Sequence, residues 1–286
     1  MTIFRRKPIM GLLAFSILLL AATCREPKQA APLNLFDLQT RQSIAGVQAV
    51  DALKSARLVL VGEHHTDPSH HEAQLQVIRA LNAQPVPVSI GLEMFRKDSQ
   101  AALDQWVAGE LDETAFEKIY LDNWNFPWPL YRSIFVYARD KRIPMVGLNV
   151  SRDITRQVAQ QGFASLSNQQ RGELAGVTCN VTREYRDFIR SAFGAHGHGN
   201  MDFIRFCEAQ LVWDTAMAIN SLNHLEQHPD RVMVLLAGSG HARKMGIPYQ
   251  IESRLPIPAT VLLPHTPDIF EPATLTDADA DFIIMP

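Results

Sequence analysis

The sequence lacks several features that would assign it to a specialised class of protein. Its 286 residues include 27 Lys and Arg against 30 Asp and Glu, so it has no basic excess for binding nucleic acid. It has no internal repeat and no low-complexity run, which excludes a repeat architecture. Apolar residues make up 47 % of the chain, enough for a sizeable core in one large domain or in one domain with an insertion.

The N-terminal apolar run, from about Ile9 to Ala22, is too short to span a bilayer comfortably. It follows the basic residues Arg5, Arg6 and Lys7 and ends just before Cys24. A basic segment followed by a short apolar segment is typical of an export signal. We therefore interpret residues 1–23 as a signal peptide and leave them out of the fold.

The segment from Leu20 to Cys24 resembles a lipobox, in which the cysteine is acylated and becomes the new N-terminus. Thr23 and Ala21 depart from the usual pattern, and the alternative is a plain secretory signal cut near Ala22. We expect lipidation at Cys24, followed by a polar tether over residues 24–32 that contains two prolines. The expected product is an exported lipoprotein anchored in the outer membrane.

The chain has only three cysteines. If Cys24 carries lipid, Cys179 and Cys207 remain as a pair in an oxidising compartment, where disulfides persist. A disulfide between them is one expectation, and two buried free thiols are the alternative.

Three apolar runs, each the length of a strand, lead into polar residues. The run over 57–61 precedes Glu63 and His65, the run over 87–92 precedes Glu93, and the run over 231–237 precedes His241. Further strands are predicted at 143–150 and 260–263, and helices at about 44–54 and 68–82. Strands that alternate with helices predict an α/β fold with a mainly parallel sheet and flanking helices.

Two long helical stretches, at about 97–142 and 153–227, separate the predicted strands. The second is too long for an ordinary crossover. We therefore expect an α/β domain over residues 33–286 with a large helical insertion, which serves as a lid or as a dimerisation subdomain.

The polar residues that follow the strands define a candidate site. Ligands bind outside the carboxyl ends of the strands in open parallel sheets, so Glu63, His65, Glu93 and His241 should converge there. Glu and His can act as general acids and bases or bind a divalent metal. No His-Glu-x-x-His motif is present, and each glutamate alone could simply cap the helix that follows it.

Two other groups of residues could bind a planar apolar ligand. An aromatic block runs from Trp124 to Tyr137 and contains Tyr131; its alternative role is ordinary helix core. His196 and His198 lie in a glycine-rich loop, where they could be ligands or exposed polar spacers.

Several separated motifs together resemble the ChaN-like family of haem-binding, iron-regulated bacterial lipoproteins. The motifs are Val-Gly-Glu-His-His65, Gly-Leu-Glu-Met-Phe95, the block Asn123 to Tyr131, Gly-Leu-Asn149, Glu208-Ala-Gln210 with Asp214, and Gly-Ser-Gly-His241. The resemblance covers most of the chain after the signal. It implies a Tiki-type α/β core and a homodimer with two stacked haems at the subunit interface.

The resemblance also implies that a tyrosine binds the haem iron with the assistance of histidine. Tyr131 is the first candidate for the iron ligand, and the alternatives are Tyr120, Tyr137 and Tyr185. His196 and His198 are the candidate haem-binding histidines. Tyrosinate is a known ligand of haem iron.

Two functions follow from these observations. The first is a haem-binding lipoprotein that holds haem at a homodimer interface and passes it to an outer-membrane receptor. The second is a metal-dependent hydrolase that uses Glu63, His65, Glu93 and His241. A binding protein is the expected function, and an enzyme is the alternative.

Overall fold

The computed structural model describes residues 32–174, 176–193 and 202–286. The predicted signal peptide, Cys24, His196 and His198 lie outside the described residues, as does the tether except for Pro32. Within the described part of the chain, no helix is both long enough and apolar enough to cross a membrane.

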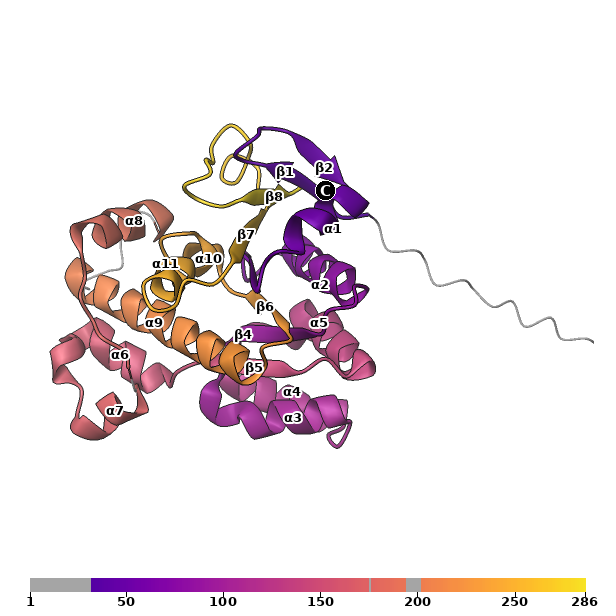
Figure 1. Cartoon of the computed structure of the whole chain (residues 1–286). Coiled ribbons are helices and arrows are strands. Elements are labelled where there is room, and N and C mark those ends of the chain that lie inside the picture. Colours follow the sequence, from indigo (N-terminus) through magenta and orange to yellow (C-terminus); the bar gives the residue numbers. More distant parts are fainter. Residues whose placement is uncertain (1–31, 175, 194–201) are drawn as a thin grey trace, which may run out of the picture. The chain divides into compact units, whose positions relative to one another are not determined.

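An eight-stranded sheet forms the centre of the fold, with the order β2-β1-β8-β7-β3-β6-β4-β5 (Figure 1). Its strands are β1 (Asn34–Asp37), β2 (Ser43–Ala45), β3 (Leu58–Val61), β4 (Val88–Arg96), β5 (Met145–Asn149), β6 (Val232–Leu236), β7 (Ala259–Pro264) and β8 (Phe282–Ile284). The strands from β8 to β5 pair in parallel, whereas β1 is antiparallel to both β8 and β2. The prediction of a mainly parallel sheet is confirmed.

The central strands are apolar throughout because both faces of the sheet are covered. Every residue of β3, β5 and β6 is buried. Successive side chains on a strand point to opposite faces, so Val59 and Val61 join one core while Leu58 and Leu60 join the other. An uninterrupted run of Leu and Val is what a strand buried on both faces requires.

Five helices contribute to the first core: α1 (Val47–Leu53), α2 (Pro68–Asn82), α3 (Gln100–Ala108), α4 (Glu113–Asn123) and α5 (Trp128–Lys141). The short helix η1 (Lys97–Ser99) connects β4 to α3. Trp106, Phe116, Tyr120 and Phe135 pack against one another in this core, with ring centroids of the contacting pairs 4.3 to 5.7 Å apart. Of the predicted aromatic block, Trp128, Tyr131 and Phe135 are buried in the same core.

The second core lies on the opposite face, beneath α9 (Phe203–Gln227) and α11 (Ile247–Glu252). Around the first half of α9 gather α6 (Arg152–Gln161), α7 (Asn168–Glu173) and α8 (Arg183–Phe193), as Figure 1 shows. The remaining short helices are η2 (Phe163–Ser165) and α10 (Ser239–Ala242). Two small apolar clusters pack against α9. The cluster around Ile154 and Val158 joins α6 to α9, and the cluster around Tyr185 and Cys207 joins α8 to α9.

The N- and C-terminal strands differ from the prediction. The helix expected from about 44 begins at Val47, because residues 43–45 form β2 instead. The sheet also continues past residues 260–263 through β8, whose three residues are too few to show an alternating pattern. The predicted strand over 86–92 is longer in the structure and reaches Arg96.

Cys179 and Cys207 are free thiols in the structure. Cys207 is buried in the cluster around Tyr185, and Cys179 packs against the same cluster. The disulfide stays a prediction.

Gly147 of β5 gives a direct test of the packing between β4 and β5. A Cβ atom at this position would collide with the backbone carbonyl of Arg96, which has no side-chain freedom to move away. We expect Gly147→Ala to lower the free energy of unfolding in urea by about 1–3 kcal/mol. Gly172→Ala in α7 is the matched control, because nothing lies within 4 Å of its added Cβ. That substitution should instead raise the free energy of unfolding by about 0.5–1 kcal/mol, the usual effect in a helix.

Candidate functional site

A cavity of about 750 Å³ lies where β3, β4, β5 and β6 end. Three kinds of side chain line it. His65, Glu93 and His241 come from the strand ends, Trp124, Phe206 and Trp213 form aromatic walls, and Arg96, Arg152 and Arg156 supply positive charge. Cofactor pockets are commonly about 300–1,000 Å³ in volume, so this cavity can hold a sizeable ligand.

The chain leaves β3 at Gly62 and places Glu63 directly behind the cavity. Glu63 is 2 % exposed, and its Oε1 accepts hydrogen bonds from His65 Nδ1 at 2.7 Å and from the Tyr131 hydroxyl at 2.5 Å. His71 Nε2 lies 3.4 Å from the other carboxylate oxygen. Three side chains from the loop after β3, from α2 and from α5 therefore surround one buried carboxylate.

These contacts decide which groups are ionised. Burial raises the pKa of Glu63, but the hydrogen bond from His65 and the nearby imidazole of His71 outweigh burial and bring the pKa down to about 2. Burial lowers the pKa of His65, yet its hydrogen bond to Glu63 and the charge of Glu93 raise the pKa overall. Burial and the adjacent Glu63 raise the pKa of Tyr131 far above its usual value, so this phenol stays protonated.

A second carboxylate and imidazole pair also borders the cavity. His241 Nδ1 lies 2.6 Å from Asp214 Oδ1, and the Tyr185 hydroxyl donates to Asp214 Oδ2 at 2.6 Å. The opposite ring nitrogen, Nε2, lies 3.9 Å from Glu93 Oε1. Because Asp214 belongs to α9 and Tyr185 to α8, the helices outside the sheet take part in the site.

The surroundings of His241 favour its charged form. Burial lowers its pKa, but the charges of Asp214 and Glu93 and the hydrogen bond to Asp214 raise it to about 9. Burial raises the pKa of Asp214, and its contacts with His241 and Tyr185 counter only part of this effect. We describe the pair as a buried imidazolium held by a carboxylate.

Glu93 combines the functional and the capping roles considered for it. Its Oε2 accepts a hydrogen bond from the backbone N–H of Gly238 at 2.6 Å, and Gly238 immediately precedes α10. Its Oε1 lies 3.9 Å from His241 Nε2. Pairing between β4 and β5 is irregular between Leu92 and Arg96, which allows Glu93 to leave the ladder at this point.

Arg152 places a cation on the cavity wall, and no carboxylate of the described residues forms an ion pair with it. Its guanidinium donates to Asn125 Oδ1 at 2.6 Å and to the carbonyl of Asn123 at 2.8 Å, and it lies 5.8 Å from the Trp124 ring centroid. Burial and the charges of Arg96 and Arg156 lower the pKa of Arg152. An anionic ligand in the cavity would relieve this repulsion.

The structure brings together the four predicted strand-end residues, Glu63, His65, Glu93 and His241. Tyr131 lies behind this group instead of in the cavity, because it is fully buried and its hydroxyl is bound to Glu63. Of the alternatives, Tyr120 is also buried, Tyr185 is bound to Asp214, and Tyr137 accepts a hydrogen bond from Asn82 on α2. The identity of the iron ligand stays a prediction.

No group of three or more His, Cys, Asp or Glu side chains among the described residues could hold a metal ion. The carboxylates and imidazoles at the strand ends are instead engaged in pairs with each other. The divalent metal expected from the sequence therefore has no structural support in the described part of the chain.

Sequence reasoning missed several residues that shape the site. Arg152 and His71 had no role assigned, Tyr185 was considered only as an alternative iron ligand, and Asp214 and Gln210 entered only as parts of the family resemblance. A buried aspartate in the apolar stretch around Trp213 was the one available signal, since charged residues are seldom fully buried unless paired.

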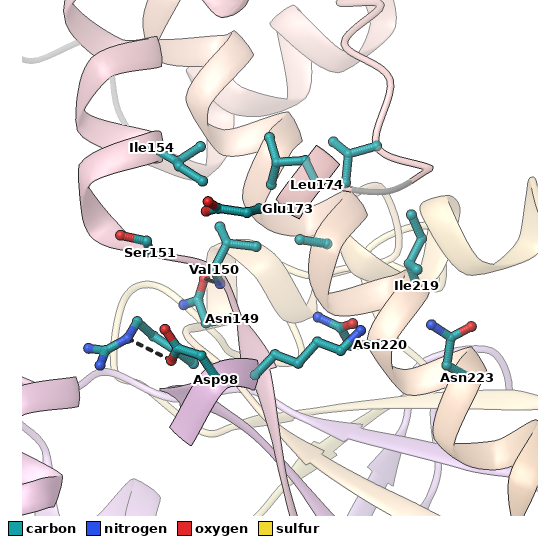
Figure 2. Close-up of a pocket in the computed structure, with 14 residues that line it drawn as sticks. Asp98, Asn149, Val150, Ser151, Ile154, Glu173, Leu174, Ile219, Asn220 and Asn223 are labelled. Carbon is teal, nitrogen blue, oxygen red and sulfur yellow. Dashed lines mark hydrogen bonds and ion pairs between the residues drawn. The ribbon is translucent and has the colours of Figure 1, made fainter. Parts of the chain in front are cut away.

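A second cavity of about 610 Å³ adjoins the first (Figure 2). The two share Arg96, Asn149 and Val150 as a common wall. Figure 2 shows Asn149, Asn220 and Asn223 on one side and Ile154, Leu174 and Ile219 on the other. Neither imidazole of the strand-end group lines it, so we keep the candidate site to the first cavity.

Comparison with known proteins gives a family and a fold. The sequence model of the family described as haem-binding uptake, Tiki superfamily, ChaN matches residues 49–251. The chain is similar to a solved structure of cofacial haem binding to ChaN of Campylobacter jejuni, with a TM-score of 0.68, 20 % identity and coverage of 88 % of this chain and 96 % of that chain.

A mutant of the erythromycin esterase EreC in its open conformation gives a TM-score of 0.47 at 14 % identity, over 82 % of this chain and 77 % of that chain. The similarity to the Campylobacter jejuni structure shows the fold. The search of curated proteins gives no match.

The raised pKa of His241 predicts how stability depends on pH. The stabilisation by the imidazolium is complete below about pH 6.5, the usual pKa of histidine, and is lost as pH rises through about 9. We expect the wild-type protein to lose up to about 3 kcal/mol of unfolding free energy over this range from this group. His241→Gln should flatten the profile, as measured by urea unfolding at each pH. His228→Gln, at an exposed histidine, is the control. If unfolding free energy depended on pH equally in His228→Gln and His241→Gln, His241 would not be the group responsible.

Proposed function

The chain belongs to the ChaN haem-binding uptake family of the Tiki superfamily, and from that premise we propose that it binds haem in the cavity at the strand ends. The observation that carries the proposal is the combination of groups in this cavity. Aromatic walls, imidazoles and Arg152, which has no carboxylate partner in the part of the chain that the structure describes, line one cavity of about 750 Å³.

Each group matches a part of haem. The flat apolar macrocycle suits the rings of Trp124, Phe206 and Trp213. The two propionates are anions, and the cavity offers Arg152 together with Arg96 and Arg156. His65 and His241 provide nitrogen atoms of the kind that bind haem iron. When bound, haem supplies an iron centre, and the protein supplies binding and orientation.

The proposal extends to the assembly and the location of the protein. ChaN of Campylobacter jejuni binds haem cofacially. By analogy, this chain forms a homodimer in which two haems stack at the subunit interface and from which haem passes to an outer-membrane receptor. Acylation at Cys24 and removal of residues 1–23 would tether the domain to the outer membrane, where such a transfer takes place.

The arrangement around Glu93 favours a second candidate function, hydrolysis by acid–base catalysis. Two imidazoles, each tied to a carboxylate through Nδ1, line the cavity beside the Glu93 carboxylate. A carboxylate and an imidazole within reach of one ligand can exchange protons with it. This function would use Glu93 and His241 as acid and base and would not require Arg152.

Replacing Arg152 tests the haem proposal. Loss of a charge-assisted hydrogen bond costs about 1.5–3 kcal/mol, so Arg152→Gln should weaken haem binding about ten- to hundredfold. The dissociation constant is measured by titrating haem into the purified soluble domain and following the Soret band. Arg79→Gln on α2, a surface arginine paired with Glu72, is the matched control and should bind as the wild type does.

Haem dimethyl ester, which lacks the propionate charges, refines this test. It should bind the wild-type protein more weakly than haem does, and Arg152→Gln should no longer affect its affinity. Absence of a saturable Soret change in the wild-type protein would contradict haem binding altogether.

The hydrolase alternative gives a separate expectation. If the protein hydrolyses esters, Glu93→Gln should lower kcat by about 10²–10⁴. Turnover of a panel of p-nitrophenyl esters measures this effect, with Glu226→Gln on the exposed side of α9 as the control. Wild-type turnover no faster than in buffer would remove this function and leave haem binding unaffected.

A further inference from the structure

We infer that His70 is a positioning residue for the haem cavity, and that protonation of its imidazole releases the loop after β3 and weakens haem binding. The inference rests on the proposed haem-binding function and adds acid as a condition that favours haem release. The loop concerned joins β3 to α2 and carries Glu63 and His65, and His65 lines the cavity.

The buried imidazole of His70 accepts a hydrogen bond from the backbone of this loop. The N–H of His64 donates to His70 Nδ1 at 2.8 Å, and the His70 side chain is 2 % exposed. The N–H of Asp67 donates to the carbonyl of His64 at 2.9 Å, so both backbone groups of His64 are bonded. Because His64 stands between Glu63 and His65 in the chain, the His70 imidazole holds the loop next to both of these residues.

The contacts of His70 require its imidazole to be neutral. Its Nε2 lies 3.3 Å from Thr266 Oγ1 and 3.4 Å from Asp67 Oδ2, and each of these oxygens can accept a hydrogen bond. The Thr266 hydroxyl itself donates to the carbonyl of Pro264 at 3.2 Å. Nε2 therefore carries the proton, and Nδ1 offers its lone pair to the loop. A second proton, on Nδ1, would point at the N–H of His64 and remove that hydrogen bond.

The groups around His70 oppose its charged form on balance. Burial is the main cause that lowers the pKa of His70, and the imidazoles of His64 and His71 lower it further. The carboxylates of Asp67 and Glu63 act in the opposite direction without reversing the shift. The contact from the segment after β7 is an uncharged hydroxyl. His70 also lies in the first turn of α2, where the helix dipole disfavours a cation.

Acid should therefore act on the cavity in one direction. Above about pH 6.5, the usual pKa of histidine, the imidazole is neutral and the loop is held. As pH falls through the lowered pKa of His70, protonation leaves the N–H of His64 without its acceptor. The loss of one hydrogen bond corresponds to about a tenfold change in an equilibrium constant. We expect haem affinity to fall by about this factor in acid because of His70.

His70→Asn separates the hydrogen bond from the titration. The Oδ1 atom of asparagine branches from Cγ as Nδ1 of histidine does, so it can accept from His64 without gaining a proton. Haem is titrated into the purified soluble domain at about pH 5.5 and about pH 7.5, and the Soret band is followed. Between these pH values the wild-type affinity should fall about tenfold more than that of His70→Asn. Equal falls in the two proteins would overturn the inference.

His70→Leu removes the acceptor at every pH. Its haem affinity at neutral pH should be about tenfold below that of the wild-type protein, as in the acidified wild type. His228→Asn, at an exposed histidine, is the matched control and should keep the wild-type pH profile. A folded His70→Leu variant that binds haem as tightly as the wild type would also contradict the inference. Circular dichroism melts identify loss of fold, in which case His70→Asn decides.

Hydrogen exchange in the haem-free protein tests the loop independently of haem. Peptides that span residues 62–67 should lose protection in acid in the wild type and keep it in His70→Asn, after correction for intrinsic exchange rates. Unchanged protection in the wild type would overturn the inference. If this protection changes as expected but the wild type gives no saturable Soret band, the haem proposal fails and the role of His70 in the loop stands. If haem binds with the same pH dependence in both proteins, haem binding stands and the inference fails.

Discussion

The charge of Glu63 is the constraint on which the rest of the site depends. An ionised carboxylate removed from water costs several kcal/mol unless hydrogen bonds replace its hydration. Here Glu63 Oε1 accepts hydrogen bonds from His65 and Tyr131, and the His71 imidazole lies 3.4 Å from Oε2. These three residues belong to three different elements. The loop after β3, helix α2 and helix α5 must therefore all be in place before Glu63 can be buried. Because Glu63 is hydrogen-bonded to His65, which lines the cavity, a fixed position for the carboxylate also fixes that part of the cavity wall.

The same principle applies to Asp214, with a different source of partners. Asp214 is 1 % exposed, and it is hydrogen-bonded to His241 in α10, just after β6, and to Tyr185 in α8. Of these three residues, one follows a strand of the sheet and two come from the outer helices. The outer helices are consequently part of the site's electrostatics and not merely a cover over it.

Much of the sheet could be predicted from sequence because its strands are short apolar runs that end in polar residues. Parallel strands bring those ends to one edge, which is why Glu63, His65, Glu93 and His241 lie together as expected. Residues on helices were harder to place. The direction in which the side chain of Asp214 or Arg152 points depends on how α9 or α6 is rotated about its axis against its neighbours. The periodicity of apolar residues in the sequence does not determine that rotation. Tyr131 shows the same difficulty, since its aromatic surroundings were anticipated but its hydrogen bond to Glu63 was not.

The order of the strands carries a consequence for how the chain reaches its native state. In the described sheet, β3 is paired on one side with β6 and on the other with β7. The partners of Leu58 in the two ladders are therefore Met233 and Ala259, which lie far along the chain. Contacts between residues so distant in sequence form slowly, because closing a long loop costs chain entropy before the strand pairing can stabilise it. Among the described strands, β3 thus gains both of its partners only after residues 232–264 have been synthesised. Pairing of β3 is delayed until then, and in the meantime this uninterrupted apolar segment is exposed to aggregation.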